Sequence, residues 1–295
     1  MRSPLLRIER ARPLLGTTVS IRVEGLAEAR AHQAIDEAFG EIALIHALMS
    51  FQEKDSDISR LNREACDRTV EVHPATFEVL HWARRIAEAS AGAFDITIAA
   101  KLVGWGLLEA PPSRFEPHPQ ANWRDVELRD DYSSVRFRRP LWMDVSGIAK
   151  GYAVDRAIER IQPFGARQVC VNAGGDLRVS GPDEERVALQ LPVTADALPV
   201  LNIQDAAVAS SSGHVEERVV NGVMCGPHVD AQLGAPVPTN RFACVVAESC
   251  LIADALTKPV LALGAKSEPV LRGFGALAHF HDPALGWRHL GKGTT

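Results

Sequence analysis

The stretch from residue 141 to 181 constrains the fold of this chain more than any other segment. It begins with the apolar residues LWM and Asp144, continues as a helix over IAKGYAVDRAIERI, and ends in RQVCVNAGGDLRVSG. The last part is predicted to form two strands joined through Gly174-Gly175-Asp176, because glycines adopt the backbone conformations that a tight turn requires. A helix followed directly by a strand hairpin indicates a fold in which the two kinds of element are mixed.

The rest of the chain shows the same mixture. Residues 17–23 alternate polar and apolar side chains like a half-buried strand, and residues 35–49 carry apolar side chains at helical spacing. A second helix is predicted to begin near Pro74 and to end at Gly92. Further predicted elements are strands over residues 206–210, 242–248 and 276–281 and a helix over residues 252–263. Strands and helices are therefore mixed along the chain without a strict alternation.

The domain organisation is predicted to be a single domain over residues 1–295. The proline-rich region 109–123 has little periodicity and is predicted to be a surface loop, which makes it the best internal break. No repeat of fixed period and no low-complexity tract is found along the chain.

Charge and cysteine content exclude several classes of protein. Thirty-two Lys and Arg against 37 Asp and Glu give a net charge of -5, so no basic field would attract nucleic acid or an anionic membrane. The 5 cysteines include no C-x-x-C pair, which disfavours a disulfide-stapled secreted scaffold. Arginines interrupt the N-terminal apolar stretch, and no segment approaches the ~20 apolar residues of a membrane span. The expected location is the cytoplasm.

The common nucleotide-binding and hydrolase motifs are absent from the sequence. The candidate binding and catalytic residues are instead polar side chains that lie close to glycines. The densest group runs from Met143 to Tyr152. It combines Asp144 at a strand end, a Ser146-Gly147 turn suited to cap a helix, and Lys150 in the first turn of that helix. The N-terminal end of a helix carries a partial positive charge, so a lysine there is unfavourable unless an anion lies nearby. Lys150 therefore indicates an anionic partner such as a phosphate. The alternative is that Ser146 only caps the helix and Lys150 points to solvent.

The second group, Ala93-Phe94-Asp95, precedes Ile96-Thr97-Ile98, which is taken as the entrance of a strand. Its aromatic ring could stack on a ligand ring while the acid accepts a hydrogen bond from the ring's edge. The alternative is ordinary packing. Gly174-Gly175-Asp176 likewise allows a close approach to a ligand or forms a plain hairpin turn.

The third group lies on the predicted helix over residues 252–263. Asp254 and Thr257 are spaced i and i+3 on one face, and one carboxylate with one hydroxyl or carbonyl would suit Mg²⁺ on a phosphate. The alternative is an ion pair between Asp254 and Lys258 at i and i+4, which spacing alone favours.

Two of the 10 histidines lie in polar, glycine-containing segments. His214 or His228 could act as a general base near neutral pH if it reached a substrate proton. The alternative is that either is a surface residue. The segment from Asp230 to Pro236 is predicted to be a turn.

Taken in order, these groups resemble the ApbE family of FAD:protein FMN transferases. The resemblance covers nearly the whole chain, and although each motif is weak alone, the ordered set is specific. The motifs are Leu15-Gly16-Thr17, Ser56 to Asn62, Gly92-Ala93-Phe94-Asp95, Asp144 to Asp155, Val171 to Asp176, Asp230 to Val237, and Ala253-Asp254-Ala255-Leu256.

The resemblance implies an α+β fold with FAD in a cleft and Mg²⁺ bridging its pyrophosphate. It implies that FMN is transferred from FAD to a threonine or serine hydroxyl of a target flavoprotein, with release of AMP. Cations would stabilise charge on the transferred phosphoryl group, and a base, here His228, would take the hydroxyl's proton. By this resemblance, the residues that would line the FAD site are Ala93, Phe94, Asp95, Asp144, Lys150 and Val229. The resemblance also implies that the Gly147 carbonyl and the Asp254 carboxylate bind the metal.

Three departures from the family pattern bear on this site. The family's hydroxyl-bearing metal ligand one turn after the aspartate is Lys258 here, so that either Thr257 supplies the oxygen or the ammonium takes over part of the cation's work. His228 is one residue closer to Asp230 than in the family's segment. The family's export signal and lipidation site are not found, which is why a cytoplasmic member is expected. The alternative functions are an FAD-binding protein without transferase activity and an FAD pyrophosphatase that yields FMN and AMP.

Overall fold

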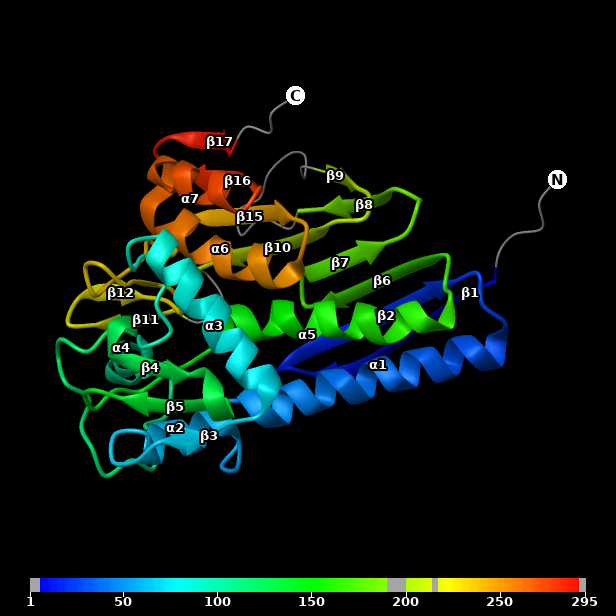
Figure 1. Ribbon diagram of the computed structural model, residues 1–295. Coiled ribbons are helices and arrows are strands. Elements are labelled where there is room, and N and C mark those ends of the chain that lie inside the picture. Colours follow the sequence, from blue (N-terminus) through cyan, green and yellow to red (C-terminus); the bar gives the residue numbers. More distant parts are fainter. Residues whose placement is uncertain (1–5, 190–199, 214–216, 292–295) are drawn as a thin grey trace.

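An eight-stranded antiparallel sheet forms the centre of the fold (Figure 1). The computed structural model describes residues 6–189, 200–213 and 217–291. In spatial order the strands are β1 (Arg7–Leu14), β2 (Thr17–Glu24), β6 (Gln168–Ala173), β7 (Asp176–Ser180), β10 (Ala207–Ser212), β15 (Phe242–Ala247), β16 (Leu277–Asp282) and β17 (Gly286–Leu290). Every neighbouring pair is antiparallel. The predicted α+β class is confirmed, as is the β6–β7 hairpin at Gly174-Gly175.

Three helices cover one face of this sheet: α1 (Glu28–Met49), α5 (Ser146–Ile161) and α6 (Cys250–Leu263) (Figure 1). The periodicity of α1 explains its position, because Ile35, Phe39, Ile42 and Ile45 fall on one stripe and are all fully buried. Burial of each such side chain contributes about 1.5–3 kcal/mol relative to exposure. The helix layer and the sheet therefore enclose the main core.

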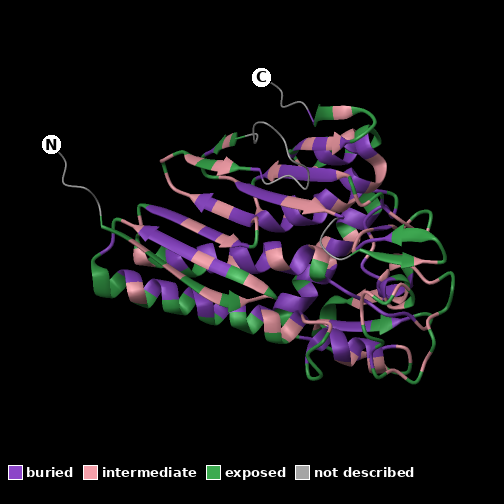
Figure 2. Cartoon of the chain, turned by 180° about the vertical axis from the view of Figure 1, so that it is seen from behind, coloured by how far each residue is buried: buried purple, intermediate pink, exposed green. Residues whose placement is uncertain are grey.

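The opposite face of the sheet is turned to the viewer in Figure 2, where buried stretches alternate with half-buried ones along the strands. The hairpin of β8 (Glu185–Ala188) and β9 (Val200–Ile203) adds to a second, smaller apolar cluster there. Leu177, Val208 and Phe242 of the large sheet belong to this cluster together with Ile203.

A smaller region packs at the end of the helix layer. Its sheet has the order β3 (Val70–Glu71), β5 (Ser134–Phe137) and β4 (Val126–Arg129), and its helices are α2 (Asp57–Glu64), α3 (Pro74–Ala89) and α4 (Ala99–Gly104). The remaining elements are β11 (Arg218–Val220), β12 (Val223–Cys225), β13 (Val229–Asp230), β14 (Ala235–Pro236) and α7 (Glu268–Gly273), with short 3-10 turns at Trp123–Asp125, Asp130–Tyr132, Gln162–Phe164 and Gly264–Ser267. Residues 105–122 form no helix or strand, as the prolines predict.

Three expectations about local structure fail. Asp144 does not end a strand: residues 141–145 form neither strand nor helix, because the backbone N–H groups of Met143 and Asp144 donate to the Asn62 side chain and the Ile96 carbonyl instead of a neighbouring strand. Residues 96–98 are not a strand but a turn that leads into α4, because the Asp95 carboxylate accepts hydrogen bonds from the backbone and hydroxyl of Thr97, both at 2.8 Å, and bends the chain. Strand β1 was not predicted, because it is an edge strand that alternates exposed with half-buried residues and carries no apolar period. Among the described residues, no helix has the length and apolar character needed to cross a membrane.

Candidate functional site

The site is built around the N-terminal end of α5. Asp144 lies just before this helix and accepts hydrogen bonds from the backbone of Ser146 at 2.9 Å and from its hydroxyl at 2.7 Å. Ser146 therefore does not cap α5 with its own side chain, contrary to one expectation, and Asp144 holds the first turn instead. The backbone N–H of Asp144 donates to the carbonyl of Ile96 at 2.8 Å, which fixes the turn after Phe94 against the helix.

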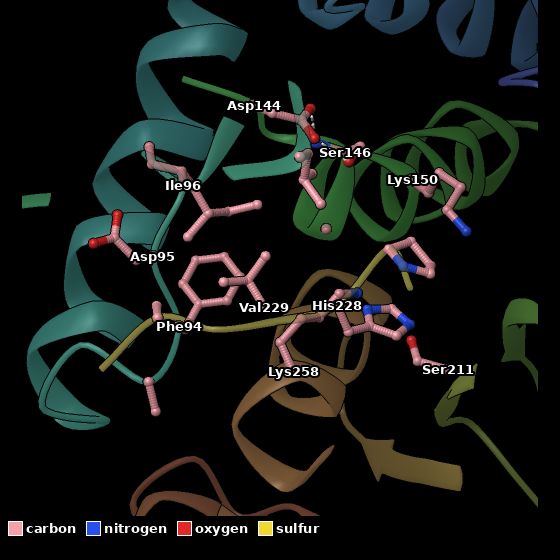
Figure 3. Close-up of a pocket in the computed structure, with 16 residues that line it drawn as sticks. Phe94, Asp95, Ile96, Asp144, Ser146, Lys150, Ser211, His228, Val229 and Lys258 are labelled. Carbon is pink, nitrogen blue, oxygen red and sulfur yellow. Dashed lines mark hydrogen bonds between the residues drawn. The ribbon is translucent and has the colours of Figure 1, made fainter. Parts of the chain in front are cut away.

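A cavity of about 210 Å³ opens beside this helix end. Eight predicted site residues line it (Figure 3): Ala93, Phe94, Asp95, Asp144, Gly147, Lys150, His228 and Val229. They come from the turn before α4, the start of α5 and the segment that enters β13, so residues far apart in the sequence meet in one place. Ser211 at the end of β10 and Lys258 of α6 complete the polar part of the wall.

The Asp95 carboxylate has a different role from the one expected. Besides Thr97, it accepts a hydrogen bond from the backbone of Trp123 at 3.1 Å, and burial raises its pKa. In Figure 3 the Asp95 side chain points away from His228 and Val229. Asp95 thus holds the loop that presents Phe94, while the apolar side chains of Phe94, Ile96 and Val229 line the cavity.

Lys150 has a protein partner. Its Nζ lies 2.8 Å from Oδ2 of Asp176, a carboxylate at the start of β7 that is almost fully buried. The sequence indicated a phosphate opposite this lysine or open solvent, and the structure places a carboxylate there. Burial raises the pKa of Asp176 to about 6, and the neighbouring charge of Asp254 acts in the same direction. The same two carboxylates outweigh the effect of burial on Lys150 and raise its pKa.

The residues expected to bind a metal are already engaged. Lys258 donates to the Asp254 carboxylate and, at 2.9 Å, to the Asp254 carbonyl, and the other carboxylate oxygen accepts from the Gly151 backbone at 3.1 Å. Thr257 is fully buried; its hydroxyl donates to the Asp254 carbonyl at 2.7 Å and lies 2.9 Å from the Ser211 hydroxyl. Neither Asp254 nor Thr257 is among the residues that line the cavity. This set therefore does not fit a divalent cation, because the carboxylate and carbonyl oxygens of Asp254 already accept hydrogen bonds from Lys258, Gly151 and Thr257.

The structure confirms the alternative that spacing favoured, the i, i+4 ion pair between Asp254 and Lys258. Within the described ranges, no group of three or more His, Cys, Asp or Glu side chains is arranged to hold a metal ion.

His228 is a half-buried imidazole on the cavity wall, next to Lys258 and Ser211 (Figure 3). Removal from solvent lowers its pKa to about 3, and the positive charge of Lys258 adds to this effect, while a hydrogen bond with the Ser212 backbone opposes it. At neutral pH the ring is therefore uncharged, and it is a weaker base than a solvated imidazole because a proton would add a positive charge beside Lys258. The other candidate base, His214, lies outside the described residues.

A second cavity of about 250 Å³ adjoins the first, and Asp144, Ser146 and Lys150 line both. Its wall includes the turn between β1 and β2, where Leu15 and Gly16 both have positive φ, at 55° and 69°. A left-handed leucine is strained, and such strain often marks a functional segment. The end of α1 and the following residues, including Phe51, complete this wall. Sequence reasoning did not assign these residues a role, although Leu15-Gly16-Thr17 was among the motifs of the resemblance.

The match to known proteins follows the same span of the chain. Residues 15–273 match the ApbE family. The chain belongs to this family. FAD:protein FMN transferase of Vibrio cholerae is 26% identical over 280 residues, which cover 88% of this chain and 83% of that protein. The protein of the same name from Haemophilus influenzae is 25% identical and covers 85% of this chain and 79% of its own length.

Solved structures agree on the fold of this ApbE family member. The ApbE protein of Thermotoga maritima superposes with a TM-score of 0.83 at 24% identity and covers 97% of both chains. The flavin transferase ApbE of Vibrio cholerae also gives 0.83, at 21% identity, and covers 99% of this chain and 98% of that one. The family and fold predicted from the sequence are confirmed.

Proposed function

We propose that this protein transfers FMN from FAD to a threonine or serine hydroxyl of a target flavoprotein and releases AMP. The observation that carries the proposal is the cavity at the start of α5, where an apolar wall with Phe94 faces Lys150, Lys258 and an uncharged His228. A flavin ring suits the apolar wall, and the pyrophosphate suits the two ammonium groups. The relatives that bear the name FAD:protein FMN transferase support the same activity.

In the proposed reaction, the acceptor hydroxyl oxygen attacks the phosphorus of the FMN half of FAD. The bond from that phosphorus to the bridging oxygen breaks, and the bridging oxygen leaves with AMP. His228 takes the hydroxyl's proton as the new ester bond forms, since a neutral imidazole has a free lone pair. Lys150 and Lys258 would stabilise the charge that spreads over the phosphoryl oxygens. We propose that Ala93, Asp144 and Val229 shape the FAD site around these groups.

The resemblance also implied Mg²⁺ as a cofactor and Gly147, Asp254 and Thr257 as its ligands. Because Lys258 donates to one carboxylate oxygen and the carbonyl of Asp254, and the Gly151 backbone donates to the other carboxylate oxygen, no step of the proposed reaction is assigned to a metal. The cytoplasmic location stays a prediction.

The proposal is tested by incubating the purified protein with FAD in an extract of its native host and then running a denaturing gel. Denaturation removes flavin that is not covalently attached, so a fluorescent band together with AMP release is the expected result. As a control, FMN plus AMP added in place of FAD should give no fluorescent band, because they lack the pyrophosphate bond that the proposed reaction breaks. AMP without a band would instead identify a pyrophosphatase, and intact bound FAD with neither product would identify a binding protein.

Two histidine variants make the test specific to the site. His228→Ala should lower the rate of FMN transfer by about 100- to 10,000-fold, the usual contribution of a positioned base. His32→Ala is the matched control, because His32 is a half-buried residue of α1 that lines neither cavity, and its loss should leave the rate unchanged. Equal rates for His228→Ala and the wild type would remove His228 from the mechanism.

A further inference from the structure

We propose that Lys258 is a built-in replacement for a divalent cation, so that this chain binds FAD and transfers FMN without a metal ion. The inference rests on the proposed function, because it assigns the positive charge that faces the FAD pyrophosphate to a side chain. The chemical class of the ligand is a pyrophosphate diester, and Lys258 is the additional catalytic residue.

The first support is the contact geometry of Lys258. Its ammonium is bonded to both the carbonyl and the carboxylate of Asp254, while the lysine side chain lines the cavity at 19% exposure. The Asp254 side chain itself is only 2% exposed. The buried Asp254 carboxylate thus binds the ammonium from the protein interior, and the Lys258 side chain still lines the cavity. An ammonium with three donors can keep these partners and still contact a phosphate oxygen.

The second support is the balance of charge just behind the cavity wall, since Lys150 and Lys258 line the cavity while their carboxylate partners do not. Two carboxylates, Asp176 and Asp254, face two ammonium groups, Lys150 and Lys258, and the pKa shifts of Lys150 and Asp176 show that the four groups interact. A divalent cation placed among them would meet two positive charges already in contact with the available carboxylates. Buried like charges repel strongly where the dielectric is low. These four groups therefore satisfy one another without a metal, and the one carboxylate on the wall itself, Asp144, accepts the hydrogen bonds of Ser146.

The third support is the space left for the lysine. Gly147, in the first turn of α5, has no Cβ, and a Cβ built there would lie 2.9 Å from Cε of Lys258. The φ of Gly147 is not in the left-handed region, so backbone conformation does not explain the glycine. The Lys258 side chain thus passes close to the α5 backbone at Gly147, and a Cβ there would displace the end of this side chain. The same approach brings the ammonium to the positive end of the dipole of α5, a 16-residue helix, where an anion is favoured.

The inference is tested first by FAD binding, which does not depend on turnover. Titration of the full-length protein with FAD, followed by flavin fluorescence, should give the same dissociation constant in EDTA and in millimolar MgCl₂. Titration with MnCl₂ in the presence of FAD should show no ion bound at the site by electron paramagnetic resonance. A dissociation constant that rises about 10-fold or more in EDTA would overturn the inference.

Variants at position 258 give the converse test. Lys258→Met keeps the length of the side chain without its charge and should weaken FAD binding in EDTA by about 10- to 100-fold, as expected for the loss of a charged hydrogen bond. Lys258→Thr frees the Asp254 oxygens and adds a hydroxyl, so its FAD binding should recover when MgCl₂ is added. Lys266→Met, at an exposed lysine, is the matched control and should bind FAD like the wild type.

Failure of this inference and failure of the proposed function give different results. If FAD binding and FMN transfer both occur but both require Mg²⁺, the function stands and the role of Lys258 is overturned. If FAD binds equally well in EDTA but no covalent flavin forms under any condition, the role of Lys258 in binding stands and the transferase is overturned. Absence of FAD binding under all conditions would overturn both.

Discussion

His228 shows how neighbouring groups decide the chemistry of a single residue. Removal from solvent and the charge of Lys258 lower its pKa to about 3, whereas the unfolded chain has the ordinary histidine pKa of about 6.5. Between these values the unfolded chain takes up a proton that the folded site does not bind. The contribution of His228 to stability is therefore present above about pH 6.5 and is lost as the pH falls towards 3.

This shift predicts that the His228 ring does not titrate between pH 5 and pH 8 in the folded protein. Imidazole nitrogen chemical shifts, with His228→Ala used to assign the resonance, provide the measurement. The control is the same protein in denaturant, in which the ring should titrate near the ordinary value. A folded-state midpoint between 6 and 7 would show that His228 is solvated and that Lys258 does not act on it.

At the scale of secondary-structure elements, the contact between α5 and α6 positions the two lysines of the cavity wall, Lys150 and Lys258. Asp155 of α5 accepts hydrogen bonds from the first backbone N–H groups of α6, those of Cys250 and Leu251, at 2.9 and 2.8 Å. Gly151 lets the two helices touch, because a Cβ there would lie 2.2 Å from the Cys250 carbonyl oxygen. This close packing places Lys258 of α6 against the start of α5.

Two glycine substitutions should therefore have opposite effects on stability. Gly151→Ala overpacks the contact and is expected to lower the free energy of unfolding by about 1–3 kcal/mol or more. Gly40→Ala, in the exposed part of α1 with no atom within 4 Å of the added Cβ, should raise it by about 0.5–1 kcal/mol. Denaturant unfolding of both variants provides the measurement. Wild-type stability for Gly151→Ala would mean that α5 and α6 can separate without cost.

At the scale of the whole molecule, the site lies where the sheet-and-helix layers meet the smaller region. The two cavities, of about 210 and 250 Å³, draw on the β1–β2 turn, the end of α1, the start of α5 and the β13 segment, and they share Asp144, Ser146 and Lys150. A ligand with two joined halves would contact more of this wall than either half alone.

FAD should accordingly stabilise the protein more than FMN or AMP at the same concentration. A ligand present at 100 times its dissociation constant adds about 2.7 kcal/mol to the free energy of unfolding. Thermal unfolding in EDTA with each of the three ligands measures the difference, and ADP controls for nucleotide binding in general. A shift with FMN or AMP equal to that with FAD would show that only one cavity is used.

The sequence by itself determined the family, the fold class and most of the local structure. Apolar periodicity located α1, α3, α5 and α6, and turn-forming glycines located the β6–β7 hairpin, because these signals depend on residues close together in the chain. The spacing of Asp254 and Lys258 favoured their ion pair for the same reason. Three of the ordered motifs, Gly92 to Asp95, Asp144 to Asp155 and Asp230 to Val237, contribute residues to the first cavity. Sequence alone did not identify the Leu15 turn and Phe51 as parts of a second cavity.

Only the tertiary structure decided which groups face each other across the site. Lys150 pairs with Asp176, the Asp95 carboxylate turns to Trp123, and Lys258 passes over Gly147. These partners are distant in the sequence, and a buried charge takes whichever opposite charge the packing brings within reach, because an unpaired one is costly. The packing of α5 against α6 thereby placed an ammonium where the family resemblance predicted a metal.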